Sequence, residues 1–349
     1  MKQNYCTLFN SEYLAKGLAM FSSLQTHSLD FHLYIFAFDE PCFRFFKTKN
    51  YENITVISLA EFEDDELLRV KETRTAGEYC WTCTPSTILF CLEKFDLAHC
   101  TYVDADILFY NDPKILTDEI KNNSVMITEH RYTCEYDQSE VSGKYCVQFI
   151  TFKNNTSGMK VLKWWRSACI EWCHARVEDG KFGDQKYLDD WTSRFESVHV
   201  MENLAGGIAP WNVQQYYFSR KGNSIYGAEK KTGKKFGAVF YHFHGVKIYN
   251  NGIVQYSDEL YELNRDVKKI FYTPYIGKLK IAEAEIRITE PDAALHSVMT
   301  DSPKQPMNVI LYITLAIHDA GIVIKNIFGR KYLSRLKHYH YHRSRMHKS

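Results

Sequence analysis

The chain has 349 residues, with 43 lysines and arginines against 42 aspartates and glutamates, so its formal net charge is only +1. No overall charge favours nucleic acid as a partner, and the apolar and charged fractions are those of a soluble globular protein. The length suffices for one large α/β domain with an appendage, or for two modest domains.

The N-terminal segment predicts a strand and a helix. Residues 1–14 lack the apolar core and cleavage site of a secretory signal, so we expect a first strand at 4–9 and no export. Asn10 can cap the helix that follows. The apolar stripe of this helix is Leu14, Leu18, Phe21 and Leu24.

Strands and helices then alternate. A strand from Phe31 is expected to end at the turn residues Asp39 and Pro41. Pro85 is expected in the first turn of another helix. Further strands are predicted at 54–58, 100–103, 107–110, 125–128 and 148–152, and helices at 59–68, 85–95 and 158–175. This alternation predicts a mostly parallel sheet with right-handed crossovers, in which ligands bind at the carboxyl ends of the strands.

No internal repeat or low-complexity linker precedes residue 250, so we expect one domain at 1–250 and a helical extension at 251–349. This extension ends in a basic tail. The apolar run 309–328 could span a bilayer by length, but Asp319 and Lys325 interrupt it. We therefore expect a helix that either packs on the main domain or lies at a membrane interface, where residues 309–348 would contact anionic lipids.

The ten cysteines show no framework spacing, and several lie in apolar patterns. This favours reduced, buried thiols and a cytoplasmic protein. Cys80 and Cys83 could form a redox pair, but no second pair completes a zinc site. Trp164, Trp165 and Trp172 lie at helical spacing and are expected in the core.

The clearest chemical signal is the pair Asp104 and Asp106, which lies between two apolar strands. Residues two apart in an extended segment point the same way, so both carboxylates can bind one ion. Hard oxygen ligands suit Mg²⁺ or Mn²⁺. The alternative is a solvated acidic turn, but burying such a pair without a cation would be costly.

The segment TYVDADILFYNDP at 101–113 resembles the DxD segment of GT-A fold glycosyltransferases. Other segments follow the order seen in retaining glycosyltransferase family eight, which includes glycogenin and bacterial lipopolysaccharide galactosyltransferases. They are YCTLFNSEYLAKGLAMFSSL from Tyr5, EYCWTCTPSTILFCLEKF from Glu78, FGDQKYLDDW from Phe182 and YHFHGVK from Tyr241. The order and spacing of these segments carry the resemblance.

This resemblance implies a GT-A-like α/β domain that uses a nucleotide-diphosphate sugar and Mn²⁺ or Mg²⁺. It implies that Asp104, Asp106 and His242 hold the metal, and that Asp184 and Gln185 lie near the anomeric carbon and carry catalysis. The donor contacts that it implies are Thr7, Phe9, Asn10, Tyr13, Gly245 and Lys247.

The chain departs from the family at several positions, so we interpret it as a distant relative or sister family. Trp81 stands where the family has an arginine, and Arg74 is the candidate to replace it in donor binding. Val147, Gln148 and Phe149 replace an Asn-Ala-Gly strand. The predicted acceptor-binding residues are Gln148, Trp211 and Asn212.

Alternatives remain at single residues. His244 competes with His242 as the third metal ligand, and either histidine could be a core residue. Asp184 could merely cap a helix, and Trp211 could pack in the core rather than stack on a sugar. If configuration is retained, either Asp184 forms a covalent intermediate or Gln185 supports attack from the leaving-group face.

The predicted function is transfer of a hexose to a glycan or glycolipid in bacterial surface polysaccharide or lipopolysaccharide synthesis. The expected location is cytoplasmic, with or without peripheral contact at the inner face of the membrane. One alternative is a sugar nucleotidyltransferase, although the N-terminus lacks a glycine-rich loop for a triphosphate. Another is a non-catalytic membrane-surface scaffold, which would leave Asp104, Asp106 and His242 unexplained.

Overall fold

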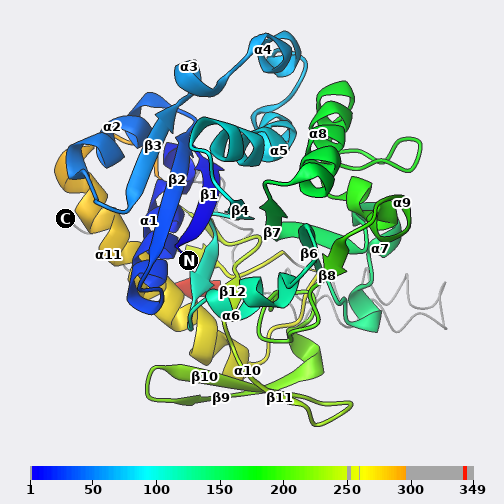
Figure 1. Cartoon of the computed structure of the whole chain (residues 1–349). Helices are drawn as coiled ribbons and strands as arrows, with labels where there is room; N and C mark the ends of the chain where they lie inside the picture. The colour runs from blue at the N-terminus through cyan, green and yellow to red at the C-terminus, as the bar shows by residue number, and fades with distance from the viewer. Residues whose placement is uncertain (1, 250–252, 259, 296–340, 344–349) are drawn as a thin grey trace, which may run out of the picture.

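A seven-stranded sheet in the order β3-β2-β1-β4-β7-β6-β8 forms the centre of the molecule (Figure 1). The computed structural model describes residues 2–249, 253–258, 260–295 and 341–343. Strands β1 to β4 are parallel to their neighbours in this group, as β8 is to β6, whereas β7 is antiparallel to β4 and β6. The sheet is therefore mostly parallel, as predicted. Its strands are β1 (Gln3–Phe9), β2 (Phe31–Ala37), β3 (Ile54–Ser58), β4 (His99–Val103), β6 (Val125–Glu129), β7 (Tyr145–Lys153) and β8 (Val198–Val200).

Different helices cover the two faces of this sheet. Tyr5 belongs to the core shared with α1 and α11, whereas its neighbour Cys6 belongs to the core shared with α5 and α8. Figure 1 shows these two pairs of helices on opposite sides. Because successive side chains of a strand point to opposite faces, a strand covered on both faces is apolar throughout. The covering helices are α1 (Leu14–His27), α5 (Ala76–Lys94), α8 (Thr156–Glu171) and α11 (Thr273–Thr289).

Asp39 fixes the start of two helical segments. Its carboxylate accepts hydrogen bonds from the Ser11 N–H at 2.8 Å and from the Cys42 N–H at 3.1 Å. The second bond opens α2 (Glu40–Lys49), where the sequence predicts only a turn. The side chain of Asn10 makes no capping bond, so the capping role predicted for it is wrong. The Asp39 carboxylate, at the end of the neighbouring strand β2, accepts from the Ser11 N–H instead.

Helix α5 begins well before the predicted start at Pro85. Thr75 and Glu78 form a capping box, in which each side chain accepts a hydrogen bond from the backbone of the other. Pro85 lies inside the helix rather than in its first turn. The predicted start is wrong because the capping box fixes the first turn at Ala76, and the later proline does not end the helix.

The remaining helices are short. The helix predicted at 59–68 is divided in two, because Ser58 and Asp64 each cap a separate start. The short helices are α3 (Leu59–Phe62), α4 (Asp65–Lys71), α6 (Lys114–Thr117), α7 (Ser139–Ser142), α9 (Trp191–Arg194) and α10 (Arg265–Val267). Single turns lie at Ser11–Tyr13, Asp118–Ile120, Cys134–Tyr136, Lys186–Asp190 and Val213–Gln215, and a π-helical turn, η6, at Lys268–Tyr272.

The chain leaves the main sheet at the end of β4. It continues into β5 (Ile107–Phe109), which pairs in antiparallel register with β12 (Phe240–His242). This pairing places His242 opposite Ile107, next to the acidic segment that joins β4 to β5. Two further sheets are β9 (Tyr216–Lys221), β10 (Ser224–Glu229) and β11 (Lys235–Gly237), and β13 (Lys247–Ile248), β14 (Ile253–Gln255) and β15 (Tyr341–Arg343).

Helix α11 packs on α1, and its residues Ala282 and Ile286 share a core with Phe21. The division of the chain at residue 250 stays a prediction, and α11 lies beyond that point. The predicted run 309–328 lies outside the described residues. Among the described residues, no helix has both the length and the apolar character that a membrane crossing requires.

Candidate functional site

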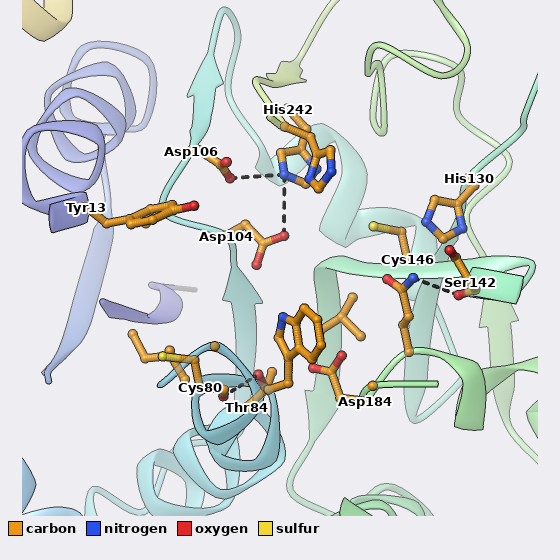
Figure 2. Close-up of a pocket in the computed structure, with 18 of the residues that line it drawn as sticks. Tyr13, Cys80, Thr84, Asp104, Asp106, His130, Ser142, Cys146, Asp184 and His242 are labelled. Carbon is orange, nitrogen blue, oxygen red and sulfur yellow. Dashed lines mark hydrogen bonds and ion pairs between the residues drawn. The ribbon is translucent and has the colours of Figure 1, made fainter. Parts of the chain in front are cut away.

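Asp104, Asp106 and His242 come together at the junction of β4, β5 and β12 (Figure 2). The His242 Nε2 lies 3.0 Å from the Asp106 Oδ1 and 3.7 Å from the Asp104 Oδ2. One ligand atom from each residue lies within 4.8 Å of the others. The Asp104 N–H donates to the Gln148 carbonyl at 3.1 Å, which ties the acidic turn to β7. The structure thus supports the sequence-based grouping of these three side chains.

The charges of this group depend on one another. Burial raises the pKa of the Asp104 carboxyl. Burial also acts to raise the pKa of Asp106, but the adjacent His242 imidazolium outweighs it and lowers that pKa. Burial disfavours the charged form of His242, yet the Asp106 carboxylate raises the imidazole pKa well above its usual value. One buried carboxylate, one half-buried carboxylate and one imidazolium leave these three side chains with a net negative charge, which a divalent cation would compensate.

Gln148 orients His242 from behind. The His242 Nδ1–H donates to the Gln148 Oε1 at 2.9 Å, and Nε2 faces the two carboxylates. The Tyr102 hydroxyl donates to the Asp104 Oδ1 at 3.1 Å. Such outer contacts fix the tautomer and direction of metal ligands. Two carboxylate oxygens and an imidazole nitrogen suit Mn²⁺ or Mg²⁺, so these residues fit the ion that the resemblance implies.

A cavity of about 650 Å³ opens in front of this group. Asp104, Asp106 and His242 lie at its floor between two walls of side chains. One wall comes from the end of β1 and the start of α5, and contains Phe9, Asn10, Glu12, Tyr13, Ala76, Gly77, Cys80 and Trp81. The other contains His130, Tyr132, Gln138, Ser142, Cys146, Trp211, His244, Leu260 and Tyr261. The cavity lies beyond the carboxyl ends of β1 and β4, where ligands bind in such sheets.

Asp184 and Gln185 both line the cavity. Figure 2 shows Asp184 across the cavity from His242. Burial, and next the negative charge of Asp104, raise the pKa of the Asp184 carboxyl to about 7. The Trp165 indole N–H donates to the Asp184 carbonyl at 2.9 Å and fixes this segment. The Gln185 side-chain amide donates to the Ser142 carbonyl at 2.7 Å. The Gln185 side chain makes no capping hydrogen bond at the start of the turn at Lys186–Asp190.

Several predicted donor and acceptor residues lie outside the cavity lining. Arg74 donates to the Ile170 carbonyl at 3.2 Å and contacts His174, so its guanidinium is committed elsewhere. Gln148 is fully buried behind His242. Asn212 is buried too, with its amide bonded to backbone carbonyls of His130 and Gly207. The predicted residues outside the lining are Thr7, Arg74, Gln148, Asn212, Gly245 and Lys247, and those inside are Phe9, Asn10, Tyr13, Asp104, Asp106, Asp184, Gln185, Trp211 and His242.

The loop after β12 is tied to Asp258. The Lys247 Nζ lies 3.6 Å from the Asp258 Oδ1, and the His244 Nε2 lies 3.4 Å from its Oδ2. Gly245 has a φ of +77°, and a Cβ there would lie 2.9 Å from the Asp258 N. His244 therefore pairs with Asp258 and not with Asp104 or Asp106, which favours His242 over His244 as the third metal ligand.

Sequence reasoning missed Lys16 and His130. Lys16 is buried, its Nζ donates to the Val246 carbonyl at 3.2 Å, and its charge acts on Asp106. Burial lowers the pKa of His130 to about 3, so this imidazole is neutral, and it stacks on Tyr132 at 4.6 Å between ring centroids. The signal for Lys16 was a single lysine within the otherwise uncharged first turns of a helix, LAKGLAMF. His130 directly follows β6, at a sheet edge where polar residues gather.

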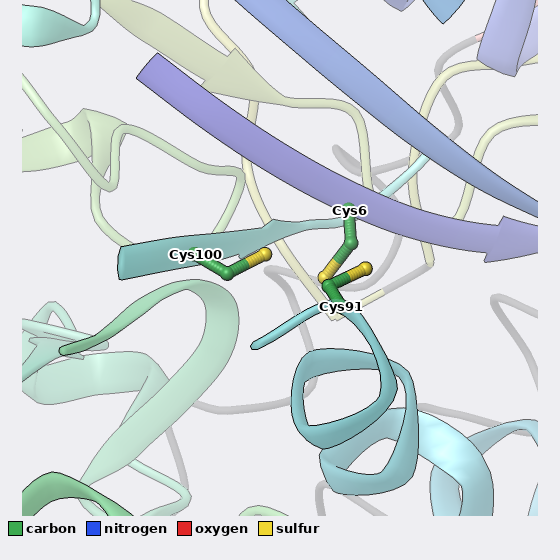
Figure 3. Close-up of side chains that lie close together, drawn as sticks. All are labelled: Cys6, Cys91 and Cys100. Atoms are coloured by element: carbon green, nitrogen blue, oxygen red, sulfur yellow. The ribbon is translucent and has the colours of Figure 1, made fainter. Parts of the chain in front are cut away.

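A second group of metal-binding side chains is Cys6, Cys91 and Cys100, whose sulfurs lie within 4.8 Å of one another (Figure 3). All three are fully buried in the core between the sheet and α5, away from the cavity. Three thiolates around a divalent ion would bury a negative charge, whereas neutral thiols pack there as small apolar groups. The Asp104 group is therefore the better candidate for a metal centre. All ten cysteines are free, as predicted.

Comparison with known proteins gives two curated relatives in Bacillus subtilis (strain 168). The uncharacterized protein YfnD is 30% identical over 302 residues, which cover 83% of this chain and 93% of YfnD. The uncharacterized protein YfnF is 30% identical over 256 residues, which cover 71% of this chain and 83% of YfnF. No family model matches the chain.

Solved structures similar to this chain include several glycosyltransferases. The galactosyltransferase LgtC has a TM-score of 0.46 and 12% identity, over 79% of this chain and 95% of LgtC. Mouse xyloside xylosyltransferase 1 has a TM-score of 0.43 and 13% identity, over 69% of this chain and 97% of the mouse chain. The glycosyltransferase GlyE of Streptococcus pneumoniae TIGR4 has a TM-score of 0.40 and 14% identity, over 58% of this chain and 45% of GlyE.

Proposed function

This chain belongs to the family of the Bacillus subtilis proteins YfnD and YfnF, and we propose that it is a metal-dependent glycosyltransferase. The observation that carries the proposal is the grouping of Asp104, Asp106 and His242 at the floor of a cavity of about 650 Å³. The donor would be a nucleotide-diphosphate sugar, and the acceptor a glycan or glycolipid of a bacterial surface polysaccharide or lipopolysaccharide.

Asp104, Asp106 and His242 would hold Mn²⁺ or Mg²⁺. A bound divalent cation supplies Lewis-acid stabilisation of the negative charge on the leaving diphosphate. Gln148 keeps the His242 Nε2 directed at the ion, since its Oε1 accepts the proton on Nδ1. We thus reassign Gln148 from acceptor binding to the support of a metal ligand.

We assign one cavity wall to the nucleotide of the donor and the opposite wall to the acceptor sugar. We assign the nucleotide to the wall with Phe9, Asn10, Tyr13 and Trp81, because rings and an amide there can contact a planar base. The opposite wall offers Trp211, which suits the apolar face of a sugar. Its indole N–H already donates to the His130 carbonyl at 2.9 Å, so the ring is held in place.

Asp184 and Gln185 remain the proposed catalytic residues. Asp184 faces the cavity with a pKa of about 7, so it can hold or release a proton near neutral pH. As a carboxylate it could act as a nucleophile toward the anomeric carbon. The Gln185 amide is oriented by Ser142 and supplies a fixed dipole beside it.

We also propose a cytoplasmic location, which the ten free thiols support. Contact of residues 309–348 with anionic membrane is part of the same proposal, and most of these residues lie outside the described structure. The donor-binding roles of Gly245 and Lys247 would require the Lys247 ammonium to exchange Asp258 for a diphosphate oxygen.

The test is release of a nucleoside diphosphate. The protein is incubated with Mn²⁺ and a panel of nucleotide sugars, beside Asp106→Asn as the inactive control. Release by the wild type alone supports glycosyl transfer or its hydrolytic side reaction. Pyrophosphate formation from a sugar phosphate and a nucleoside triphosphate would indicate a nucleotidyltransferase instead. No turnover with any donor, together with no Mn²⁺ binding, would refute the proposal and favour a scaffold.

A further inference from the structure

The sheet formed by β9, β10 and β11 carries a concentrated positive charge. Residues 216–237 contain six lysines and arginines and one acidic residue, Glu229, which gives a net charge of +5 in a chain whose total is +1. All six cationic side chains are exposed, and none of them forms an ion pair within the described part of the chain. They are Arg220, Lys221, Lys230, Lys231, Lys234 and Lys235.

The two faces of this sheet differ in character. The inner face is anchored to the rest of the molecule, since the Phe218 ring lies 5.0 Å from the Phe271 ring of η6. The outer face exposes two tyrosines, Tyr217 at 68% and Tyr226 at 47%. By the alternation of strand residues and the pairing register, Lys221 and Lys235 lie on the same outer face.

Tyrosines and lysines together on one open face suit a membrane surface. The Lys230 Nζ lies 5.0 Å from the centre of the Tyr217 ring, so cation and ring are already adjacent. Lysines near an anionic bilayer gain free energy from its negative surface potential, and tyrosines prefer the headgroup region, where their rings and hydroxyls are both accommodated. No residue of this sheet lines the cavity in front of Asp104 and Asp106, so its outer face is separate from the proposed reaction site.

We propose that the outer face of β9-β10-β11 docks on an anionic phospholipid surface. The argument is charge complementarity, because a segment with a net charge of +5 and an outer face with two exposed tyrosines match a negatively charged headgroup layer. This docking does not depend on the proposed reaction, and it is distinct from a contact made by residues 309–348.

The test is sedimentation of the full chain with vesicles of phosphatidylcholine, with or without phosphatidylglycerol. We expect binding only to the anionic vesicles, and release at high salt. The double variant Lys221→Glu with Lys235→Glu should bind at least about 30-fold more weakly, since each lysine near such a surface contributes about a factor of five. Tyr217→Ser with Tyr226→Ser should weaken binding without changing the charge.

The matched control reverses two exposed lysines elsewhere, Lys94→Glu with Lys160→Glu. These lie on α5 and α8, at the opposite end of the molecule from β9 and β10 in Figure 1. The control should bind as the wild type does, and all variants should keep the wild-type melting temperature, since their side chains are exposed. Equal loss in the control, or wild-type binding by Lys221→Glu with Lys235→Glu, would overturn the proposal. A third outcome would also overturn it: the tyrosine variant binds the vesicles as the wild type does, and a soluble glycerol-phosphate polymer displaces the protein from them. That result would identify a phosphate polymer as the partner.

Discussion

The Nδ1 of His242 lies 2.9 Å from the Oε1 of Gln148, although 94 positions separate the two residues in sequence. This bond leaves the His242 Nε2 free to face Asp106 at 3.0 Å. A side-chain amide on β7 thereby sets the direction of an imidazole on β12. The metal centre that we propose depends on this contact as well as on its three ligands.

Gln148→Leu should weaken Mn²⁺ binding by about 10- to 100-fold, because the imidazole loses the acceptor that fixes its tautomer. Gln148→Glu keeps an acceptor oxygen and should retain far more of the affinity. Mn²⁺ titration followed by electron paramagnetic resonance measures both. If Gln148→Leu binds Mn²⁺ as tightly as the wild type, the amide does not orient a metal ligand.

Asp104→Asn and Asp106→Asn should each reduce turnover by about a thousandfold or more, because stabilisation of the leaving group accounts for several kcal/mol of the barrier. Circular dichroism should show an unchanged fold. Product formation with a responsive donor, measured at saturating Mn²⁺, gives the rates. Near wild-type rates in either variant would contradict the metal assignment.

His242→Ala should raise the Mn²⁺ concentration needed for half-maximal activity much more than His244→Ala does. The structure gives His242 the two carboxylates as neighbours, whereas His244 lies 3.4 Å from Asp258. The two variants serve as controls for each other, since each removes an imidazole and the two positions are two residues apart in sequence. The reverse order would identify His244 as the ligand.

Asp184→Asn should stabilise the metal-free protein at alkaline pH. The pKa of Asp184 is about 7 in the fold against 3.8 as the ordinary value, so the folded state binds the proton more tightly than the unfolded state. Wild-type stability should therefore fall as pH rises from about 4 to about 7, by as much as about 4 kcal/mol from this group. Urea unfolding in the presence of a chelator measures the free energy of unfolding. The value for the variant should rise relative to that of the wild type over that pH range. A difference that is constant with pH would contradict the buried proton.

The same Asp184→Asn variant, and Gln185→Ala, should lower kcat more than they raise the KM for the donor. Groups that act mainly in the transition state behave in this way, whereas binding groups change both the ground state and the transition state. Initial rates over a range of donor concentrations separate the two parameters. A large rise in KM at unchanged kcat would mark these residues as binding groups.

The parts of the site that sequence predicts best are those fixed by local pattern. Asp104 and Asp106 stand between two apolar strands, and the strand alternation places such a turn at the ligand-binding edge of the sheet. Gln148 was harder, because nothing near it in sequence shows that its partner is His242. Arg74 seemed available to a donor, yet the fold commits its guanidinium to Ile170 and His174.

The starts of helices were also predicted only in part from local sequence patterns. The capping box of Thr75 and Glu78 is a local pattern in the sequence, but Pro85 gave the more obvious and wrong signal. Asp39 could not be predicted to cap the turn at Ser11, because that contact joins the ends of two neighbouring strands. The hydrogen-bond acceptor of Lys16 is likewise distant, since Val246 lies 230 positions away in sequence.

The packing of α11 on α1 has a consequence for biosynthesis. Leu14 and Phe21 emerge from the ribosome early, yet Ala282 and Ile286, which belong to the same core, are synthesised more than two hundred residues later. Contacts between such distant parts of a chain form slowly, because a long loop must close before they contribute any stability. We expect the part of this core that α11 covers to stay exposed in the nascent chain until α11 has been synthesised, and the chain to need chaperone protection during that interval.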